Sequence, residues 1–395
     1  MKRLLIIVIA SLVVSLPANA ATLKQISVKS LTPLTTIGSV SDVSGVLTRG
    51  SEIVIYGSRD DKSYVRAMDS SGKELWSSEL SPDLNTIATA GTVDSSGNIW
   101  IAGSASKTVI APAPTETLNP INPDDLSATI IGKEIELNAV AVWKIPMGIS
   151  TPETFLNQQE SAVLVNSITS DGSGTSLVGV IATETGSAGF LMSTDAAGTY
   201  IDSIKIGSQA TNINSVLRNK DGSKTLVGSS SEVLGGKKLL GLTDGIIMAL
   251  DSKNEVTKVV RSSEVKAKRS WNTASSTYLL GGTVIKGSTT QSAVTKFSKT
   301  FAPQWTYRFN STGSTYTAGS SRALIASTST IQTLRGWVPK TARALLLTFN
   351  TKGLITEAYS GPSKSNEVFG LIESKELGVV VFAISEQTIS AFLAN

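Results

Sequence analysis

The sequence predicts an all-β fold in which a four-stranded sheet is repeated around a ring. Two observations support this prediction: short apolar runs recur about every fifty residues, and no segment has the spacing of an amphipathic helix. Most of the runs end in Gly, and the last has Ala in that place. The runs are IVIYG (53–57), IWIAG (99–103), TSLVG (175–179), KTLVG (224–228), TYLLG (277–281), TLRG (333–336) and VVVFA (379–383).

Each run belongs to a unit of similar composition. A second apolar segment follows the run, as in GIIMAL (245–250), and a polar turn then leads to a third, as in VTKVVR (256–261). A further segment precedes each run and ends in another turn, as in INSVLRNKDG (213–222). Four antiparallel strands repeated in this way are typical of a β-propeller, and the runs predict seven blades.

The tetrapeptide DSSG occurs at 69–72 and again at 94–97, each time between two apolar segments. Asp and Gly tolerate the backbone angles of tight hairpin turns, which favours a turn at both places. A calcium loop would need several oxygen ligands at fixed spacing, whereas Asp69 and Asp94 each stand alone among Ser and Gly. We therefore interpret both tetrapeptides as turns.

The stretch DSSGNIWIAG (94–103) fits the phrase D-x-x-G-N-x-aromatic-x-x-G. Through this phrase and its repeats the chain resembles secreted bacterial propellers of the quinoprotein-like and NHL-like type. The resemblance implies the architecture over nearly the whole chain after residue 20, and it implies ligand-binding loops on one face of the ring. It implies no particular activity. The tryptophan-docking repeats of quinone-binding propellers are missing, and we expect no cofactor.

The last unit ends at Asn395, directly after its third strand. The segment TLKQISVKSL (22–31) alternates like a strand and precedes the first unit. We therefore expect this N-terminal strand to pair with residues 386–394 of the C-terminal blade and to close the ring, because closure removes exposed sheet edges.

Residues 1–20 have the features of a cleavable signal peptide. Lys2 and Arg3 precede an apolar run, and Ala18-Asn19-Ala20 fits the site that signal peptidase cleaves. We expect cleavage after Ala20 and a single propeller domain over 21–395, with no membrane span in the mature chain. The expected location is secreted, periplasmic or at the cell surface.

The chain contains neither Cys nor His. This excludes disulfides, His-dependent nucleophilic triads and His-ligated metals, and we expect no metal site. The net charge of +4 falls to +2 once Lys2 and Arg3 are removed, so the charge does not favour nucleic acid as a partner.

Two loops carry a cluster of cations. SEVLGGKKLLGLTD (231–244) lies within the fourth blade, and SSEVKAKRSW (262–271) leads into the fifth. If the blade register holds, the two loops are neighbours on one face and form a site for a polyanion or an acidic glycan; the alternative is a solvated loop whose charges aid solubility. The candidate ligand-binding residues are Lys237, Lys238, Lys266, Lys268, Arg269 and Trp271.

An insertion in the second blade covers 106–138 and is rich in Pro and acidic residues. It is either a lid or an extended arm that contacts a partner, or else a surface insertion, which a fold tolerates at low cost.

These observations favour an exported, non-enzymatic propeller that binds a macromolecule, protein or glycan, at the cell envelope through its loop-rich face. The alternative is a carbohydrate-active hydrolase or lyase that uses carboxylates on the same face. A structural envelope component is a further alternative. The acidic residues expected on that face, with no spacing that marks a pair, are Glu153, Glu160, Glu264 and Glu367.

Overall fold

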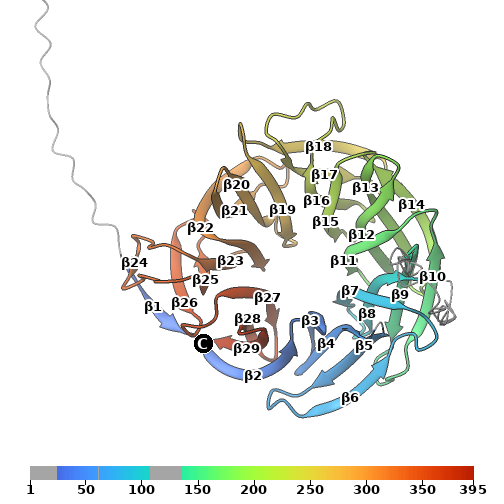
Figure 1. Cartoon of the computed structure of the whole chain (residues 1–395), viewed down its shortest axis with the longest axis horizontal. Helices are drawn as coiled ribbons and strands as arrows, with labels where there is room; N and C mark the ends of the chain where they lie inside the picture. The colour runs from blue at the N-terminus through green and yellow to red at the C-terminus, as the bar shows by residue number, and fades with distance from the viewer. Residues whose placement is uncertain (1–24, 61, 107–135) are drawn as a thin grey trace, which may run out of the picture.

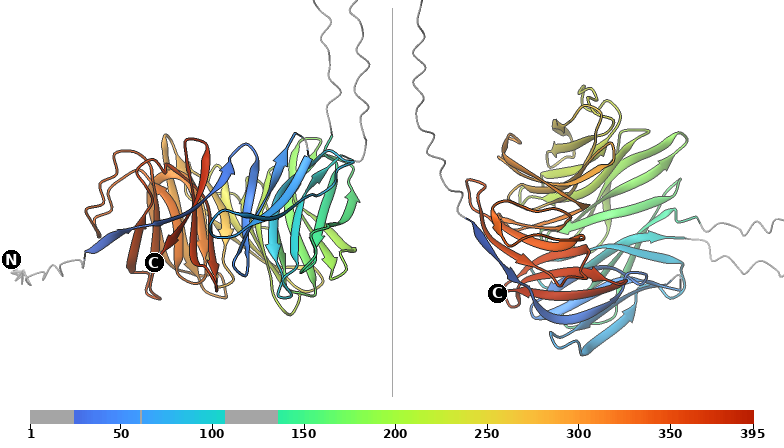
Figure 2. Two further views of the ribbon diagram at one scale, coloured as in Figure 1. Left: turned by 90° about the horizontal axis from the view of Figure 1, so that it is seen from below. Right: turned by 60° about the vertical axis from the view of Figure 1, so that its left-hand side comes forward.

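The structure is a computed structural model that describes residues 25–60, 62–106 and 136–395. In these ranges the chain forms β-sheets arranged around a common axis, as Figure 1 shows, and the strands cross the thickness of the ring (Figure 2). The fold is an all-β propeller, as the sequence predicts. The predicted signal peptide (1–20) and residues 107–135 of the predicted insertion lie outside the described residues. None of the described segments is a helix long and apolar enough to cross a bilayer.

Four of the sheets contain four consecutive antiparallel strands each. The first two sheets contain β3 (Val43–Arg49), β4 (Glu52–Arg59), β5 (Lys62–Met68), β6 (Glu74–Glu79), β7 (Thr86–Val93), β8 (Ile99–Ala105), β9 (Ala139–Ile145) and β10 (Glu153–Gln158). The next two contain β11 (Val163–Ser170), β12 (Gly174–Thr183), β13 (Gly186–Asp195), β14 (Tyr200–Ile206), β15 (Thr211–Arg218), β16 (Lys224–Ser230), β17 (Asp244–Leu250) and β18 (Val256–Ser262).

A fifth four-stranded sheet combines the two ends of the described chain. It contains β27 (Glu367–Ser374), β28 (Gly378–Ser385), β29 (Thr388–Ala394) and β2 (Thr32–Ser39). The remaining strands form one nine-stranded sheet. They are β19 (Lys268–Ala274), β20 (Leu279–Lys286), β21 (Thr289–Phe297), β22 (Pro303–Ala318), β23 (Arg322–Ser327), β25 (Arg343–Phe349), β26 (Ile355–Ser360), β1 (Ile26–Ser30) and β24 (Leu334–Arg335).

The prediction of seven separate blades is therefore wrong, since five sheets are separate four-stranded blades and the rest is continuous. The reason lies in β22, which runs for 16 residues without a turn. Its first half pairs with β21 and its second half pairs with β23, after a register shift between Ser311 and Thr315. One strand thus joins two groups of strands that the repeat pattern treats as distinct.

The sixth predicted run is also misplaced. Only Leu334–Arg335 of TLRG (333–336) form a strand, the short β24, whereas RALIAS (322–327) forms β23 and pairs with β25. The pattern passes over β23 because it ends in Ser327 instead of Gly. The other six runs fall on β4, β8, β12, β16, β20 and β28.

The outer strand of the fifth sheet is β2, which pairs antiparallel with β29 from Thr32↔Leu393 to Ser39↔Thr388. The N-terminal part of the chain thus pairs with the C-terminal blade, but the predicted segment 22–31 is not the part that does so. Its residues Ile26–Ser30 form β1, which pairs parallel with β26. Two register shifts interrupt β2, one of them beside Pro33. Its residues therefore alternate less regularly than those of the segment before it, and the sequence pattern points to that segment instead.

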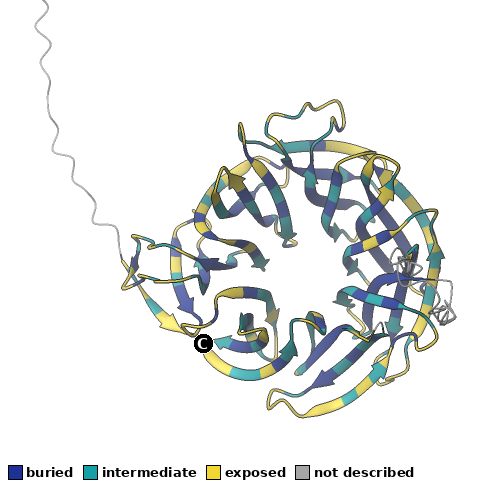
Figure 3. Cartoon of the chain, in the orientation of Figure 1, coloured by how far each residue is buried: buried dark blue, intermediate teal, exposed yellow. Residues whose placement is uncertain are grey.

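The core lies between neighbouring sheets. Trp100 and Trp143, which the sequence places inside strands, are buried, and Trp76 and Trp305 are partly buried. The outer strands β6 and β10 alternate exposed and half-buried residues along the rim, as Figure 3 shows. The tryptophans therefore serve packing, which is their predicted role.

Candidate functional site

The ring has two faces of different construction. On one face, which we call the loop face, each sheet connects its second strand to its third and continues to the next sheet. In the β15–β18 sheet this end is marked by the pairs Ser230↔Asp244 and Gly245↔Ser262. On the opposite face, the turn face, tight hairpins join the first strand to the second and the third to the fourth. The six candidate ligand-binding residues lie on or next to connections of the loop face.

The DSSG turns lie on the turn face, and their hydrogen bonds confirm that they are turns. The Oδ1 atom of Asp94 accepts from the backbone N–H of Ser96 (2.8 Å) and Asn98 (3.0 Å). Its Oδ2 atom accepts from Asn98 Nδ2 and from Trp100 Nε1, both at 2.9 Å. Gly97 has a φ angle of +81°, which favours glycine. The carboxylate is therefore fully used in holding the hairpin.

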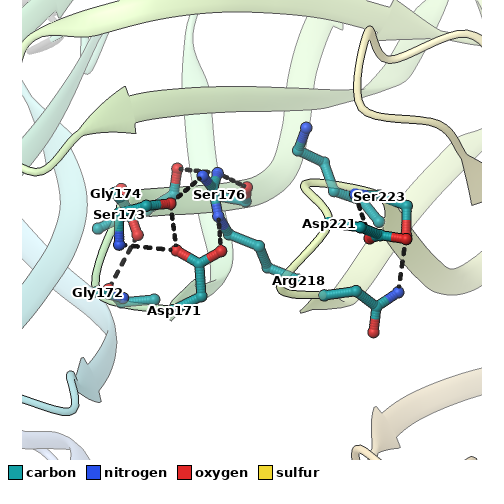
Figure 4. Close-up of polar contacts among 12 residues, drawn as sticks. Asp171, Gly172, Ser173, Gly174, Ser176, Arg218, Asp221 and Ser223 are labelled. Carbon is teal, nitrogen blue, oxygen red and sulfur yellow. Dashed lines mark hydrogen bonds and ion pairs between the residues drawn. The ribbon is translucent and has the colours of Figure 1, made fainter.

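One buried pair of opposite charges on the turn face links two neighbouring sheets. Figure 4 shows Asp171 in the β11–β12 turn, where its Oδ1 atom accepts from the N–H and Oγ of Ser173. The Nε atom of Arg218, from the neighbouring sheet, lies 2.9 Å from Asp171 Oδ2, and the two side chains are 10% and 11% exposed. Arg218 also donates to Ser173 Oγ and Ser176 Oγ. This pair ties one sheet to the next, and each side chain neutralises the charge of the other.

On the loop face, the two candidate loops are neighbours, as the register predicts. The backbone N–H of Leu242 donates to the carbonyl of Ala267 at 2.8 Å, and that of Arg269 donates to the carbonyl of Thr243 at 2.9 Å. A parallel bridge joins Thr243 to Lys268. The two loops thus form one continuous surface.

A buried ion pair holds the longer loop on β18. Arg261 Nε lies 2.9 Å from Asp244 Oδ2, and the two side chains are 6% and 0% exposed. The same guanidinium donates to the carbonyls of Glu232 and Lys237, while Asp244 accepts from the N–H of Gly241. Charge-assisted hydrogen bonds of this kind are strong in a poorly solvated setting, so the loop is fixed to its sheet.

The four candidate lysines are exposed and form no ion pair with any described residue. Large apolar side chains on the same two loops are exposed as well. Their exposed fractions are 69% for Leu240, 68% for Val265, 61% for Val233 and 56% for Leu242. We call these four residues, together with Lys237, Lys238, Lys266 and Lys268, the apolar-cationic patch.

Arg269 lies at the base of this patch and is a buried cation without a counterion. It is 9% exposed, its Nε atom has no hydrogen-bond acceptor, and no described carboxylate lies within ion-pair distance. Burial, with a smaller contribution from the charge of Arg308, lowers the pKa of Arg269 to about 10. The group is therefore charged at neutral pH. By contrast, the buried Arg49 is paired with Glu52 at 2.8 Å.

Trp271 is not available to a ligand, and this corrects its assignment as a binding residue. It is 0% exposed and packs between two sheets, edge to face with Phe297 at 5.6 Å between ring centroids. The guanidinium of Arg269 lies 4.5 Å from the centre of its indole ring. Trp271 is apolar and aromatic like an exposed binding residue, but its strand β19 places it in the core. Its role in the site is to support Arg269 through a cation–π contact.

Two further cations border the patch and were not found in the sequence. Lys286 Nζ lies 2.8 Å from Glu264 Oε1, and Arg308 pairs with Glu264 Oε2. These hydrogen bonds, that of Lys286 first, lower the pKa of Glu264. The three residues lie far apart in the chain and no local motif connects them, so only the packing of the sheets could reveal them. Glu264 is thus already neutralised and does not serve as the counterion of Arg269.

Glu160 and Glu367 lie beside connections of the loop face. Glu153 begins β10 on the turn face, opposite Lys144, so its predicted place on the loop face is wrong. These three acidic residues are not brought together into a recognisable site. Among the described residues no group of three or more acidic side chains is arranged to hold a metal ion. The groups that the fold brings together on the loop face are therefore cations and apolar side chains.

No known family model matches the sequence, and no curated protein matches it either. The structure is similar to the WD40 domain of Toxoplasma gondii coronin, with a TM-score of 0.49 and 9% identity over 93% of this chain and 87% of that chain. It is also similar to Chaetomium thermophilum Sqt1, with a TM-score of 0.45 and 10% identity over 94% of this chain and 98% of that chain. The propeller assignment rests on the strand pairing described above.

Proposed function

We propose that the protein is a non-enzymatic binding scaffold that holds an acidic protein partner on the apolar-cationic patch. The observation that carries this proposal is the gathering of four exposed aliphatic side chains and four unpaired lysines on two adjacent loops. An exposed apolar surface edged by charge is typical of an interaction site. The scaffold below the patch is rigid, because Arg261 and Asp244 fix the longer loop.

A protein partner fits this surface better than a glycan does. Exposed Val and Leu side chains gain free energy when they are buried against another apolar surface, at about 25 cal/mol per Å². A glycan offers little such surface, and Trp271, the aromatic residue of these two loops, is buried and cannot stack on a sugar ring. The lysines and Arg269 then select for acidic residues on the partner and accelerate association.

We further propose that the protein acts outside the cytoplasm, after cleavage behind Ala20, as a member of the quinoprotein-like or NHL-like propellers. The charge and apolar pattern of residues 1–20 and the phrase at 94–103 support this part of the proposal. The pairing of β2 with β29, and the core cluster that β28 and β29 share with β4, support closure of the ring at this point.

The test uses two probes, an acidic amphipathic peptide of alternating Glu and Leu residues and heparin. We expect the double substitution L240S/L242S and the double substitution K237E/K238E each to weaken peptide binding about tenfold or more, measured by fluorescence anisotropy. The matched control is K352E/K375E, which reverses two exposed lysines on the turn face and should leave binding nearly unchanged. Heparin binding that responds to K237E/K238E, together with peptide binding that does not respond to L240S/L242S, would contradict a protein partner.

A further inference from the structure

The strands nearest the axis share an irregularity close to the loop face. A register shift separates Val165 from Ser167 in β11, Ile213 from Ser215 in β15, and Trp271 from Thr273 in β19. The extra residue of each of these β-bulges is an asparagine: Asn166, Asn214 and Asn272. A bulge redirects a side chain that would otherwise alternate between the two faces of its sheet, and here it brings the three amides to the axis.

These amides line a cavity of about 350 Å³ on the axis of the ring. The inner strands of both the separate sheets and the nine-stranded sheet contribute residues to it. Figure 1 shows these strands around the centre of the ring. Among the described residues, no lysine, arginine, aspartate or glutamate lines it. Its polar lining consists of Ser44, Tyr56, Thr89, Asn166, Ser167, Asn214, Ser215, Asn272, Thr273 and Tyr316.

Two of the asparagines donate their side-chain N–H groups to backbone carbonyls of the next sheet. Asn166 Nδ2 donates to the carbonyl of Ile213, and Asn214 Nδ2 donates to the carbonyl of Trp271, each at 2.8 Å. Each amide thereby ties its strand to the bulge of the next sheet. The Oδ1 atoms of Asn166 and Asn214 form no hydrogen bond with another described residue, so two residues of the cavity lining have a side-chain acceptor available.

Two tyrosine hydroxyls supply the complementary donors. Tyr56 and Tyr316 line the cavity, and neither hydroxyl is hydrogen-bonded to another described residue. Tyr56 crosses above Gly45, where an added Cβ atom would lie 2.1 Å from the tyrosine oxygen, so only glycine leaves room for it. Burial raises the pKa of both tyrosines, and both therefore remain protonated donors.

We infer that this cavity binds a neutral, polyhydroxylated ligand of the size of a mono- or disaccharide. Hydroxyls that donate and amide oxygens that accept match the alternating groups of a sugar, and Phe369 and Leu371 add apolar contact. A charged ligand would lose its hydration without gaining an opposite charge, which is costly. The volume lies within the usual range of small-molecule sites. The inference is independent of the protein partner proposed above.

The test screens the full-length chain against glucose, galactose, mannose, N-acetylglucosamine, maltose and cellobiose by saturation-transfer NMR. We expect at least one to bind with a Kd of about 1 mM, measured by calorimetry. The double substitution Y56F/Y316F removes the two hydroxyls and keeps both rings, so it should weaken binding about tenfold with little change in melting temperature. The matched control is Tyr307→Phe, in the other half of β22 and outside the cavity.

Absence of binding for every sugar at 20-fold excess over about 1 mM would overturn the inference. It would also be overturned if Y56F/Y316F and Tyr307→Phe weakened binding equally. A Ser215→Phe substitution gives an independent readout, because a bulky ring in the cavity should abolish sugar binding and leave binding of the acidic peptide to the patch intact.

Discussion

The turn face and the loop face are connected by the same strands but follow different rules. On the turn face one device recurs: a side-chain oxygen accepts two backbone N–H groups of a hairpin, as Asp195 does from Ala197 and Thr199. On the loop face the connections vary from the two-residue hairpin between Thr183 and Gly186 to the long excursion over 231–243. The comparison teaches that the repeated face builds the fold and the irregular face carries the candidate site.

Two hairpins of the turn face have an aromatic residue in the left-handed conformation, and packing of the rings offsets the backbone cost. Tyr278 and Phe301 occupy positions with φ angles of +62° and +58°, where the other hairpins have glycine or, at Asn254, asparagine. Their rings pack edge to face at 5.5 Å, and Phe301 is buried. Packing of this kind offsets the backbone cost of the left-handed conformation, which is about 1–2 kcal/mol for each residue.

The largest effect that we predict is a loss of stability when the aspartate of one DSSG turn is replaced, compared with the same replacement in the other turn. Asp94→Ala leaves Trp100 Nε1, Asn98 Nδ2 and two backbone N–H groups without their acceptor, and Trp100 is buried. We expect the free energy of unfolding to fall by about 3 kcal/mol, because buried donors without acceptors are costly. Urea denaturation followed by tryptophan fluorescence measures the change.

The control for this prediction is Asp69→Ala in the identical tetrapeptide. Asp69 accepts only from Ser71 and from the N–H of Lys73, in an exposed turn, and we expect a loss of about 1 kcal/mol. Equal losses for the two substitutions would show that burial beside Trp100 does not distinguish the turns.

Much of this fold could be predicted from the sequence because the turn face repeats. Six of the seven apolar runs form second strands of their units, and DSSG is a turn in both places. The predictions of seven blades and of the pairing N-terminal segment are wrong because the local sequence at these two places does not follow the repeat. β22 continues through a position where the pattern implies two strands, and β2 is less regular than β1 although it is the strand that pairs with β29.

The candidate site was predictable in part, for a related reason. Composition identified the cationic loops, and the blade register placed them side by side. The sequence does not show that Lys268 is exposed and Trp271 is buried. Both residues lie in β19, and only the packing of neighbouring sheets decides which of them is covered. It also gave no sign of Lys286 and Arg308, which reach Glu264 across the sheets.

An effect of intermediate size tests whether the loop face has its own structural anchors. Glu232 accepts hydrogen bonds from Thr211 Oγ1 at 2.6 Å and from the backbone of the neighbouring connection, including Ser208 and Ala210. Burial alone would raise its pKa, but the hydrogen bonds from Thr211, Ser208, Ala210 and Gln209 outweigh that effect and lower the pKa to about 2. A carboxyl with a depressed pKa stabilises the fold above the pKa of the unfolded chain.

The stability that Glu232 adds is therefore present above a pH of about 4.5 and is lost as the pH falls toward 2. Between pH 6 and pH 3 we expect the wild type to lose about 1 kcal/mol more than Glu232→Gln, after solvent screening is allowed for. The difference between the two proteins cancels the titration of all other carboxyl groups. Parallel urea curves over this range would show that the anchor on the loop face contributes nothing.

The last prediction, with effects of about 1 kcal/mol or less, concerns one backbone position on each face. The β28–β29 hairpin of the loop face has Glu386 and Gln387 at φ angles of +50° and +67°, whereas the β27–β28 turn has Gly378 at +79° with no atom within 4 Å of an added Cβ. Gln387→Gly relieves the left-handed strain and should stabilise the protein by about 0.5 kcal/mol, part of the gain being offset by greater freedom of the unfolded chain. Gly378→Ala introduces the same strain and should destabilise it by about 1 kcal/mol.

Thermal unfolding of both variants measures these two changes in stability. Shifts of the same sign would mean that backbone conformation does not govern the difference between the faces, and that the glycines of the turn face have another role.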